Sequence, residues 1–193
     1  MRLIRNSLNK IMPKNLLILI DIQNEYVTTG REFYLNGIEK SLNNCRLILN
    51  FARKNNWKIA HIQHLNGIDA ANFRPNTKYS DFAPGFEPQP QEMHFVKHDY
   101  SCYSSPDFAN CLEQFTQSEN AIYVIGYNSI MCCLSTLEEA RRKKHILNFV
   151  TDASYAKALH GFSEFTTHEL MLDLYKTKKL GNLITTDDVL KII

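Results

Sequence analysis

The sequence predicts an α/β protein built around a mostly parallel sheet, and three observations lead to this prediction. Short apolar runs alternate with longer segments of helical period, which is the pattern of βαβ units. The chain has 193 residues, enough for one sizeable domain with its own core. Hydrophobic residues make up 44% and charged residues 22%, the balance of an ordinary soluble globular protein rather than a disordered one. We expect one domain over 14–193, preceded by a loosely held segment at 1–13.

Six short apolar runs are the predicted strands, and segments of helical period are the predicted helices. The strands are expected at 15–21, 57–64, 93–97, 121–126, 146–152 and 182–185. The helices are expected at 37–56, 105–117, 129–143, 163–179 and 185–193. Between the second and third strands, residues 66–91 are rich in proline and have no durable period. We expect a long loop there, and loops of that length are usually lids or binding segments.

The five cysteines indicate reduced thiols rather than a disulfide framework. Their number is odd, their spacing is irregular, and they include an adjacent pair that could bridge only with strain. Cys45 and Cys111 each lie on the apolar face of a predicted helix, so we expect both in the core. The opening 1–14 is basic and free of acids but lacks the apolar stretch and cleavage site of a leader. We therefore expect a cytoplasmic protein.

The charge of the chain gives little reason to expect a polyanionic partner. The formal net charge is only +2. The densest basic run, 141–144, falls at the C-terminal end of a predicted helix, where cations meet the negative end of the helix dipole. The longest wholly apolar run, 16–20, is far shorter than the ~20 residues of a membrane span. We expect neither a nucleic acid nor a membrane as partner.

Two adjacent cysteines, Cys132 and Cys133, fall on different faces of the predicted helix 129–143. Cys133 recurs with Ile130, Leu134 and Leu137 at helical spacing, so it lies on the buried stripe. Cys132 lies off that stripe in the first turn, where free N–H groups and the helix dipole favour an anion. That position lowers the pKa of a thiol and raises its reactivity. Periodicity alone leaves two interpretations of Cys132 open: a nucleophile, or a small, partly buried packing residue.

Polar residues end two of the predicted strands and favour the first interpretation. The first strand ends in Asp21 and the third in Lys97, and the fourth leads directly into the turn that carries Cys132. Ligands of open parallel sheets bind outside the carboxyl ends of the strands, so these side chains should converge. Alone, Asp21 could be a cap and Lys97 a surface lysine. Together they supply a base, a cation and a nucleophile for acyl transfer.

Three stretches of the chain resemble the isochorismatase-like superfamily of cysteine hydrolases, which includes nicotinamidases, N-carbamoylsarcosine amidohydrolase and streptothricin-hydrolase-like enzymes. They are LLILIDIQNEYV, HFVKHDYSCYSS and VIGYNSIMCCLSTLEEA. The resemblance extends to VTDASYA and GNLITTDDVL, and so covers nearly the whole chain from about residue 14. It implies a three-layer α/β/α fold around a mostly parallel six-stranded sheet.

The resemblance also implies roles for individual residues. Asp21 corresponds to the general base, Lys97 to the residue that steadies the thiolate, and Cys132 to the nucleophile. A non-proline cis peptide is implied between Tyr127 and Asn128, which would let the backbone N–H of Asn128 join that of Cys132 in an oxyanion hole. Such a hole stabilises the charge that develops in acyl transfer. Members of the superfamily are commonly oligomeric, so we expect a homodimer or homotetramer.

One departure from the superfamily concerns metal binding. Nicotinamidases carry an Asp-x-His metal motif after the second strand, whereas this chain has His64, Leu65 and Asn66 there. His61 and His64 could suggest zinc, but a spacing of three residues on a strand sends their side chains to opposite faces. We expect no metal and no other cofactor.

These residues predict a cysteine-dependent hydrolase that cleaves a non-peptide C–N bond, in an amide or ureide, through a thioester. One alternative is isochorismatase-type hydrolysis of a vinyl ether, which needs no thiol. Another is a papain-like protease, but no imidazole is apparent as the base of the cysteine. A third is a catalytically silent family member that acts as a binding protein. For the small-molecule amide, the expected pocket residues at the strand ends are Gln23, Tyr26, His64, Tyr103 and Tyr127.

Overall fold

The structure is a computed structural model that describes residues 15–117 and 120–192. The predicted N-terminal segment 1–13 lies outside the described residues. Six strands form one sheet in the order β3-β2-β1-β4-β5-β6, and every neighbouring pair is parallel. This confirms the α/β prediction. The strands are β1 (Leu16–Ile20), β2 (Lys58–His64), β3 (Met93–Lys97), β4 (Ile122–Gly126), β5 (Asn148–Ser154) and β6 (Asn182–Ile184).

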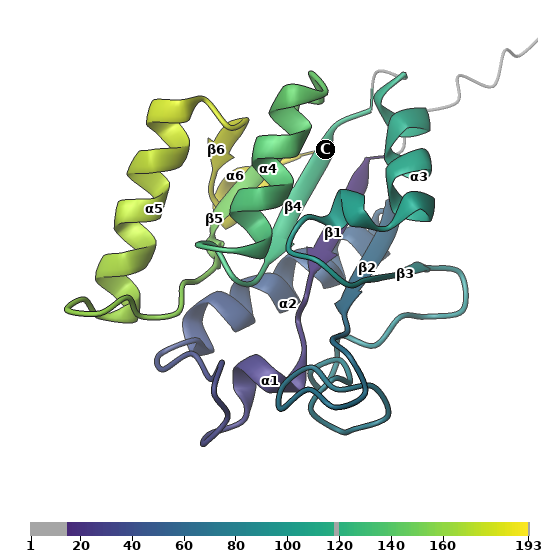
Figure 1. Ribbon diagram of the computed structural model, residues 1–193. Helices are drawn as coiled ribbons and strands as arrows, with labels where there is room; N and C mark the ends of the chain where they lie inside the picture. The colour runs from purple at the N-terminus through teal and green to yellow at the C-terminus, as the bar shows by residue number, and fades with distance from the viewer. Residues whose placement is uncertain (1–14, 118–119, 193) are drawn as a thin grey trace, which may run out of the picture.

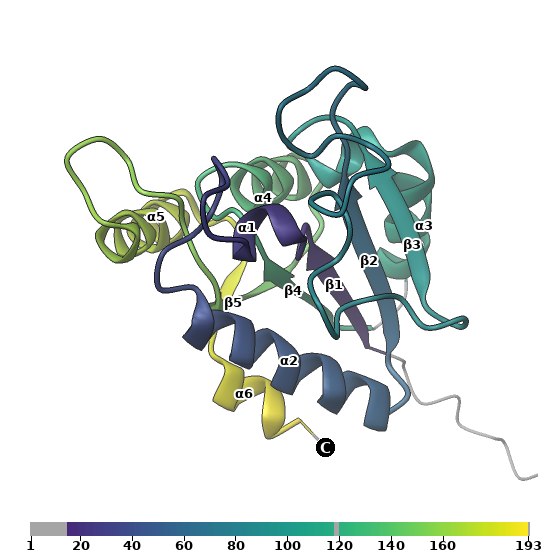
Figure 2. The same cartoon turned by 90° about the horizontal axis from the view of Figure 1, so that it is seen from below.

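Helices cover both faces of the sheet and make three layers (Figures 1 and 2). α3 (Pro106–Thr116), α4 (Cys132–Arg142) and α5 (Glu164–Lys178) pack on one face. α2 (Glu39–Lys54) and α6 (Thr186–Leu190) pack on the other. Two short elements, α1 (Asn24–Val27) and the 3₁₀ turn η1 (Cys102–Ser104), follow β1 and β3. No helix in the described part of the chain is long and apolar enough to cross a membrane.

The order of the strands places a crevice at the carboxyl end of β1. The chain runs from β1 to β2 and β3 on one side, and then returns to add β4 on the other side of β1. Connections that leave in opposite directions open the crevice in which ligands of such sheets bind. The side chains that follow β1, β3 and β4 therefore meet at one place.

Gly126 permits the close approach of β4 to β1 at this crevice. Its φ is +117°, and a Cβ there would lie 2.1 Å from the carbonyl oxygen of Ile20. No other residue type fits that space. The backbone N–H of Tyr127 then donates to the same carbonyl oxygen at 2.8 Å, which fixes the exit of β4 against β1.

The helix predicted at 129–143 begins later than expected, at Cys132. The carbonyl oxygen of Asn128 accepts hydrogen bonds from the N–H groups of Met131 and Cys133, and this tight turn replaces the first helical turn. Cys132 is therefore the first residue of α4. Helix boundaries commonly shift in this way because the flanking turn competes for the same backbone groups.

Most of the predicted core residues are buried. All five side chains of β1 are at most 1% exposed, and Cys45 and Cys133 are fully buried, as expected. The prediction that Cys111 is a core residue was wrong, because its side chain is only partly buried beside Met93. The loop at 66–91 contains no helix or strand. It packs back on the exit of β1, where the N–H of Ala83 donates to the Ile22 carbonyl oxygen at 2.9 Å.

Candidate active site

Asp21, Lys97 and Cys132 come together in the crevice at the carboxyl end of the sheet. Lys97 Nζ lies 2.8 Å from Asp21 Oδ2 and 3.4 Å from Cys132 Sγ. Asp21 and Lys97 are fully buried, and Cys132 is 4% exposed. Asp21 follows β1 with a φ of 51°, a left-handed conformation that is uncommon outside glycine and clusters at functional sites. A base, a cation and a thiol thus share one enclosed space.

The Asp21 carboxylate has spare capacity as an acceptor. No described residue donates a hydrogen bond of good geometry to either of its oxygens, and its contact with Lys97 is an ion pair. Nearly all buried polar atoms have hydrogen-bond partners, so an open carboxylate in a buried site calls for a functional explanation. The oxygen that does not contact Lys97 remains available to receive a proton.

The resting thiol of Cys132 is held in its neutral form. Burial raises the pKa of Cys132, the Asp21 carboxylate raises it further, and the Lys97 ammonium only partly offsets them. Burial alone would lower the pKa of Lys97, but the carboxylate of Asp21, joined by Cys132 once its sulfur is ionised, outweighs it and raises that pKa. Lys97 is therefore a fixed cation beside a thiol that still carries its proton.

Cys133 faces a different environment. Its Sγ lies 3.6 Å from the carbonyl oxygen of Gly126 and 4.0 Å from Ser154 Oγ. Burial raises its pKa well above the usual range for a thiol. It packs in the core beneath α4 and does not contact Lys97. The two adjacent cysteines thus have different surroundings, as their positions on different faces of the predicted helix indicate.

The turn before α4 leaves two backbone N–H groups without an acceptor among the described residues. The peptide bond between Tyr127 and Asn128 is cis. Asn128 Oδ1 accepts from the N–H of Ile130 at 3.3 Å and from that of Lys157 at 3.1 Å, which ties the turn to the segment after β5. Within the described residues, the N–H groups of Asn128 and Cys132 have no acceptor.

A cavity of about 160 Å³ opens onto Cys132. None of its lining side chains is an acid, a lysine or an arginine. Aromatic rings make up much of the wall, and Tyr26 and Phe73 pack with their ring centroids 5.3 Å apart. The lining residues are Tyr26, Phe33, His64, Asn66, Asn72, Phe73, Tyr100, Met131 and Cys132.

Comparison with known proteins settles the family of the chain. A model of the isochorismatase domain matches residues 15–188. The chain belongs to the isochorismatase family of hydrolases. It is 28% identical over 138 residues to the isochorismatase family protein YddQ of Bacillus subtilis. The aligned region covers 71% of this chain and 75% of that protein.

Solved structures share the fold of this isochorismatase family member at lower sequence identity. An isochorismatase from Pseudomonas putida superposes with a TM-score of 0.80 and 22% identity, covering 92% of both chains. A cysteine hydrolase from Pseudomonas syringae superposes at 0.78 with 15% identity, covering 92% of this chain and 91% of the other. N-carbamoylsarcosine amidase from Thermoplasma acidophilum superposes at 0.73 with 15% identity, covering 90% and 97%.

Two of the expected pocket residues line the cavity of this family member, and Tyr103 does not. Tyr26 and His64 are part of its wall. Tyr103 was predicted in the pocket, but its hydroxyl lies 2.9 Å from Nδ1 of His145, in the segment between α4 and β5. Its ring packs on Phe108 in the core. Tyr103 therefore contacts α3 and the segment that follows α4, and it does not line this cavity.

The predictions for Tyr127 and Gln23 as pocket residues also need correction. Tyr127 is fully buried, and its hydroxyl lies 3.0 Å from Ser41 Oγ, on the face of the sheet that α2 covers. The Gln23 amide accepts from the His64 N–H at 2.8 Å and donates to the carbonyl oxygens of His64 and Ser80. Gln23 thus fastens the long loop to the ends of β1 and β2, and neither residue lines the cavity.

Sequence reasoning missed most of the cavity wall. All of the missed residues lie in loops or turns, where no periodic pattern predicts which way a side chain points. Only the aromatic residues of the loop at 66–91, among them Phe73, could have pointed to part of this wall. They are Phe33, Asn66, Asn72, Phe73, Tyr100 and Met131.

His61 and His64 point in different directions, as their spacing predicts. His61 Nε2 lies 2.8 Å from Glu92 Oε2, and burial lowers the pKa of this imidazole. His64 faces Lys97 instead. Within the described residues, no three side chains of His, Cys, Asp or Glu are arranged to hold a metal ion. A metal-free site remains a prediction.

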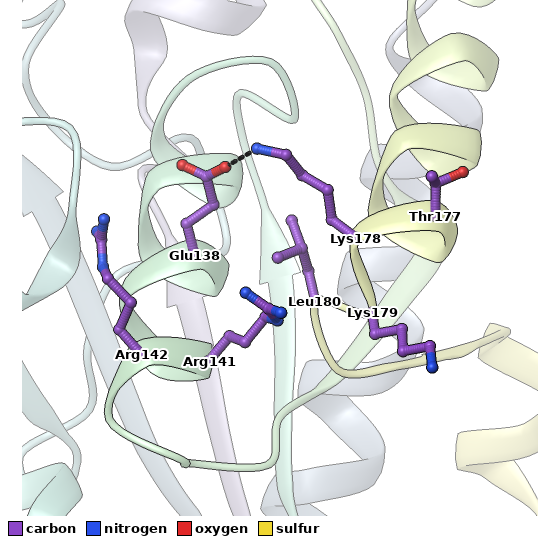
Figure 3. A pocket seen from close by; sticks show the side chains of 7 residues that line it. All are labelled: Glu138, Arg141, Arg142, Thr177, Lys178, Lys179 and Leu180. Carbon is purple, nitrogen blue, oxygen red and sulfur yellow. Dashed lines mark hydrogen bonds and ion pairs between the residues drawn. The ribbon is translucent and has the colours of Figure 1, made fainter.

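A larger cavity lies elsewhere, between the C-terminal turns of α4 and α5 (Figure 3). It measures about 440 Å³ and contains part of the basic run, with Lys178 paired to Glu138. Cations at the ends of two helices neutralise the negative ends of the helix dipoles, as the sequence indicates. The wall contains no thiol and no base near a nucleophile, so the smaller cavity at Cys132 is the candidate active site. The residues that line the larger cavity are Glu138, Arg141, Arg142, Thr177, Lys178, Lys179 and Leu180.

Proposed function

We propose that this protein is a cysteine hydrolase that cleaves a non-peptide C–N bond in a small, uncharged amide or ureide. One observation carries the proposal: Cys132 opens onto a cavity while its sulfur lies 3.4 Å from Lys97, which is ion-paired with Asp21. A nucleophile needs a base to take its proton and a charge to stabilise the anion, and both are in contact here.

The proposed reaction begins when the substrate carbonyl displaces water from the cavity. Asp21 takes the proton from Cys132 Sγ, Lys97 stabilises the thiolate, and the sulfur attacks the carbonyl carbon. The carbonyl oxygen becomes an oxyanion, which accepts hydrogen bonds from the free N–H groups of Asn128 and Cys132. The C–N bond then breaks, and the proton held by Asp21 passes to the leaving amine.

A thioester on Cys132 remains after the amine departs. Asp21, ionised again, takes a proton from a water molecule that attacks the thioester carbonyl. The C–S bond breaks, the thiolate recovers the proton, and a carboxylic or carbamic acid leaves. The raised pKa of Cys132 supports this order, because the thiol keeps its proton until a substrate needs the nucleophile.

The cavity supports a small and uncharged substrate. Its volume of about 160 Å³ is below the ~300 Å³ at which pockets for drug-sized ligands begin. A carboxylate or phosphate in the substrate would lose its hydration without gaining a cationic partner from the wall, which is costly. The aromatic rings suit a planar group, and the amides of Asn66 and Asn72 offer polar contacts.

The same observation weighs against vinyl-ether hydrolysis. Isochorismate is a dicarboxylate, and the side chains that line the cavity include no lysine or arginine to receive it. Hydrolysis of a vinyl ether also gives no role to a thiol that is aligned with a base. A silent binding protein is the remaining alternative, and it predicts an unreactive Cys132.

The test is a screen of matched amides that differ only in charge, with release of ammonia or amine and trapping of the acyl-enzyme by mass spectrometry. We expect turnover of uncharged amides, little turnover of their carboxylated analogues, and an acyl adduct on the peptide that contains Cys132. An adduct on another residue, or a preference for carboxylated substrates, would contradict the proposal. Slow labelling of Cys132 by iodoacetamide at all pH values, together with ligand binding, would instead support a binding protein.

A further inference from the structure

His64 stands where nicotinamidases carry the aspartate of their metal motif, so the resemblance supplies no role for an imidazole there. It is the last residue of β2 and pairs in register with Lys97 at the end of β3. Its Nδ1 lies 3.1 Å from Lys97 Nζ, and its Nε2 lies 2.9 Å from Asn66 Oδ1. The imidazole therefore bridges the candidate catalytic lysine and the loop that follows β2.

The neighbours of His64 determine which of its nitrogens carries the proton. Asn66 Nδ2 donates to the carbonyl oxygen and to Oδ1 of Asn72, at 3.1 and 2.9 Å. These two contacts identify Nδ2 as the nitrogen of the Asn66 amide, so its oxygen, Oδ1, faces His64. An amide oxygen can only accept a hydrogen bond. Nε2 of His64 must then carry the hydrogen, and Nδ1 presents a lone pair to Lys97. Only the neutral imidazole fits both contacts.

The Lys97 ammonium lies close to four polar groups but has only three protons to donate. Its hydrogen bonds go to the Asp99 carbonyl oxygen at 3.0 Å, to His64 Nδ1 at 3.1 Å and to Cys132 Sγ at 3.4 Å. Asp21 Oδ2, at 2.8 Å, contacts the ammonium as an ion pair. In the resting state, the hydrogen bond to Cys132 is the longest of the three, because a thiol is a weak acceptor.

Ionisation of Cys132 changes this arrangement. When Asp21 receives the thiol proton, its carboxylate loses its negative charge and the sulfur of Cys132 gains one. The Lys97 ammonium is then attracted less to Asp21 and more to Cys132. The N–H of Lys97 that faces Cys132 can then bind the thiolate more strongly, provided that the other two stay in place. Their acceptors, His64 Nδ1 and the Asp99 carbonyl oxygen, are neutral and keep the same charge throughout the transfer.

We propose that His64 is a positioning residue that anchors Lys97, so that the remaining N–H of the ammonium stays directed at Cys132 while the thiol proton passes to Asp21. The inference rests on the proposed function, because it assumes that Cys132 ionises during a reaction. It assigns His64 a contact with the lysine rather than with the substrate alone.

The surroundings of His64 favour the neutral form that this role requires. Burial lowers its pKa, and the positive charge of Lys97 lowers it further. The carboxylate of Asp21 acts in the opposite direction, and His98 adds to the lowering. The remaining face of the ring packs edge-on against Phe73, with the centroids 5.1 Å apart.

Two substitutions separate anchoring from packing. His64→Asn places an amide oxygen near the position of Nδ1 and keeps an acceptor for Lys97, whereas His64→Leu fills the space without one. We would measure the rate of Cys132 alkylation by iodoacetamide from neutral to alkaline pH, using peptide mass spectrometry. The partly buried Cys111 reports on the reagent, and the fully buried Cys133 reports on unfolding.

We expect His64→Leu to slow alkylation of Cys132 by ~10-fold or more at neutral pH, the effect of one hydrogen bond to a charged group. The deficit should begin to close only at strongly alkaline pH, because the raised pKa of Cys132 keeps its thiol protonated below that range. His64→Asn should stay close to wild type at all pH values. A purely steric effect would be the same at every pH.

Two outcomes would overturn the inference. Equal Cys132 profiles in wild type and His64→Leu would remove the anchoring role and leave the proposed function intact. A His64→Asn variant as slow as His64→Leu would do the same. If wild-type Cys132 reacts no faster than Cys133, the proposed function fails, and the inference fails with it.

Discussion

Cys132 and Cys133 are consecutive residues with opposite surroundings: the sulfur of Cys132 lies 3.4 Å from the Lys97 ammonium, and that of Cys133 lies 3.6 Å from the Gly126 carbonyl oxygen. Cys132→Ala should therefore abolish hydrolysis. Cys133→Ala should keep at least about half of it and lower the free energy of unfolding by about 1 kcal/mol. Activity assays and urea titrations of both variants test this. An inactive but folded Cys133→Ala protein would reverse the assignment.

Substitution of Asp21 should change hydrolysis and thiol reactivity in opposite directions. The carboxylate raises the pKa of Cys132, so Asp21→Asn should lower that pKa and increase the thiolate fraction at neutral pH. Alkylation of Cys132 should become faster, while hydrolysis falls by ~10²-fold or more because no base remains. Asp99→Asn is the matched control, since only the backbone oxygen of Asp99 contacts Lys97. Alkylation that falls together with hydrolysis would refute a base at Asp21.

Asn66→Asp should make the reaction more sensitive to acid. A carboxylate 2.9 Å from His64 Nε2 favours the protonated imidazole and raises the pKa of His64, which burial and Lys97 now lower. Protonated His64 cannot accept from Lys97, so activity should be lost at a higher pH than in wild type. The profile of kcat/KM against pH checks this. Asn66→Ser adds no charge, and a similar shift in that variant would argue against the role of His64.

Gly126→Ala should destabilise the protein strongly. The new methyl group would meet the Ile20 carbonyl oxygen at 2.1 Å, in a backbone conformation that alanine rarely adopts. We expect a loss of about 3 kcal/mol or more in the free energy of unfolding. Gly67→Ala is the control, because nothing lies within 4 Å of a Cβ there. Urea denaturation of the two variants should differ clearly, and equal midpoints would show that the strand ends can separate.

The sequence predicts the three reactive residues because their positions follow from local pattern. Asp21 and Lys97 end apolar runs, and parallel strands bring their carboxyl ends to one edge of the sheet. Cys132 is distinguished from Cys133 by helical periodicity, even though α4 begins three residues later than expected. The structure brings these residues together, while their catalytic roles rest on the proposed reaction.

The cavity wall could not be predicted in the same way. Phe33, Phe73 and Tyr100 lie in loops, where contacts between distant segments decide which way a side chain points. Tyr103 shows the converse case. It follows a strand that ends at the site, but its partner His145 is remote in the sequence and draws the side chain away from the cavity. No local pattern contains that information.

The pairing of Ile20 with Gly126 joins the start of the described chain to its second half. Contacts of such long sequence separation form late, because closing the intervening chain costs conformational entropy. A nascent chain that ends before β4 carries Asp21 and Lys97 but has neither the thiol nor the crevice. We therefore expect Cys132 to become reactive only when β4 pairs with β1. The rate at which Cys132 gains its reactivity would then report the rate of this late folding step.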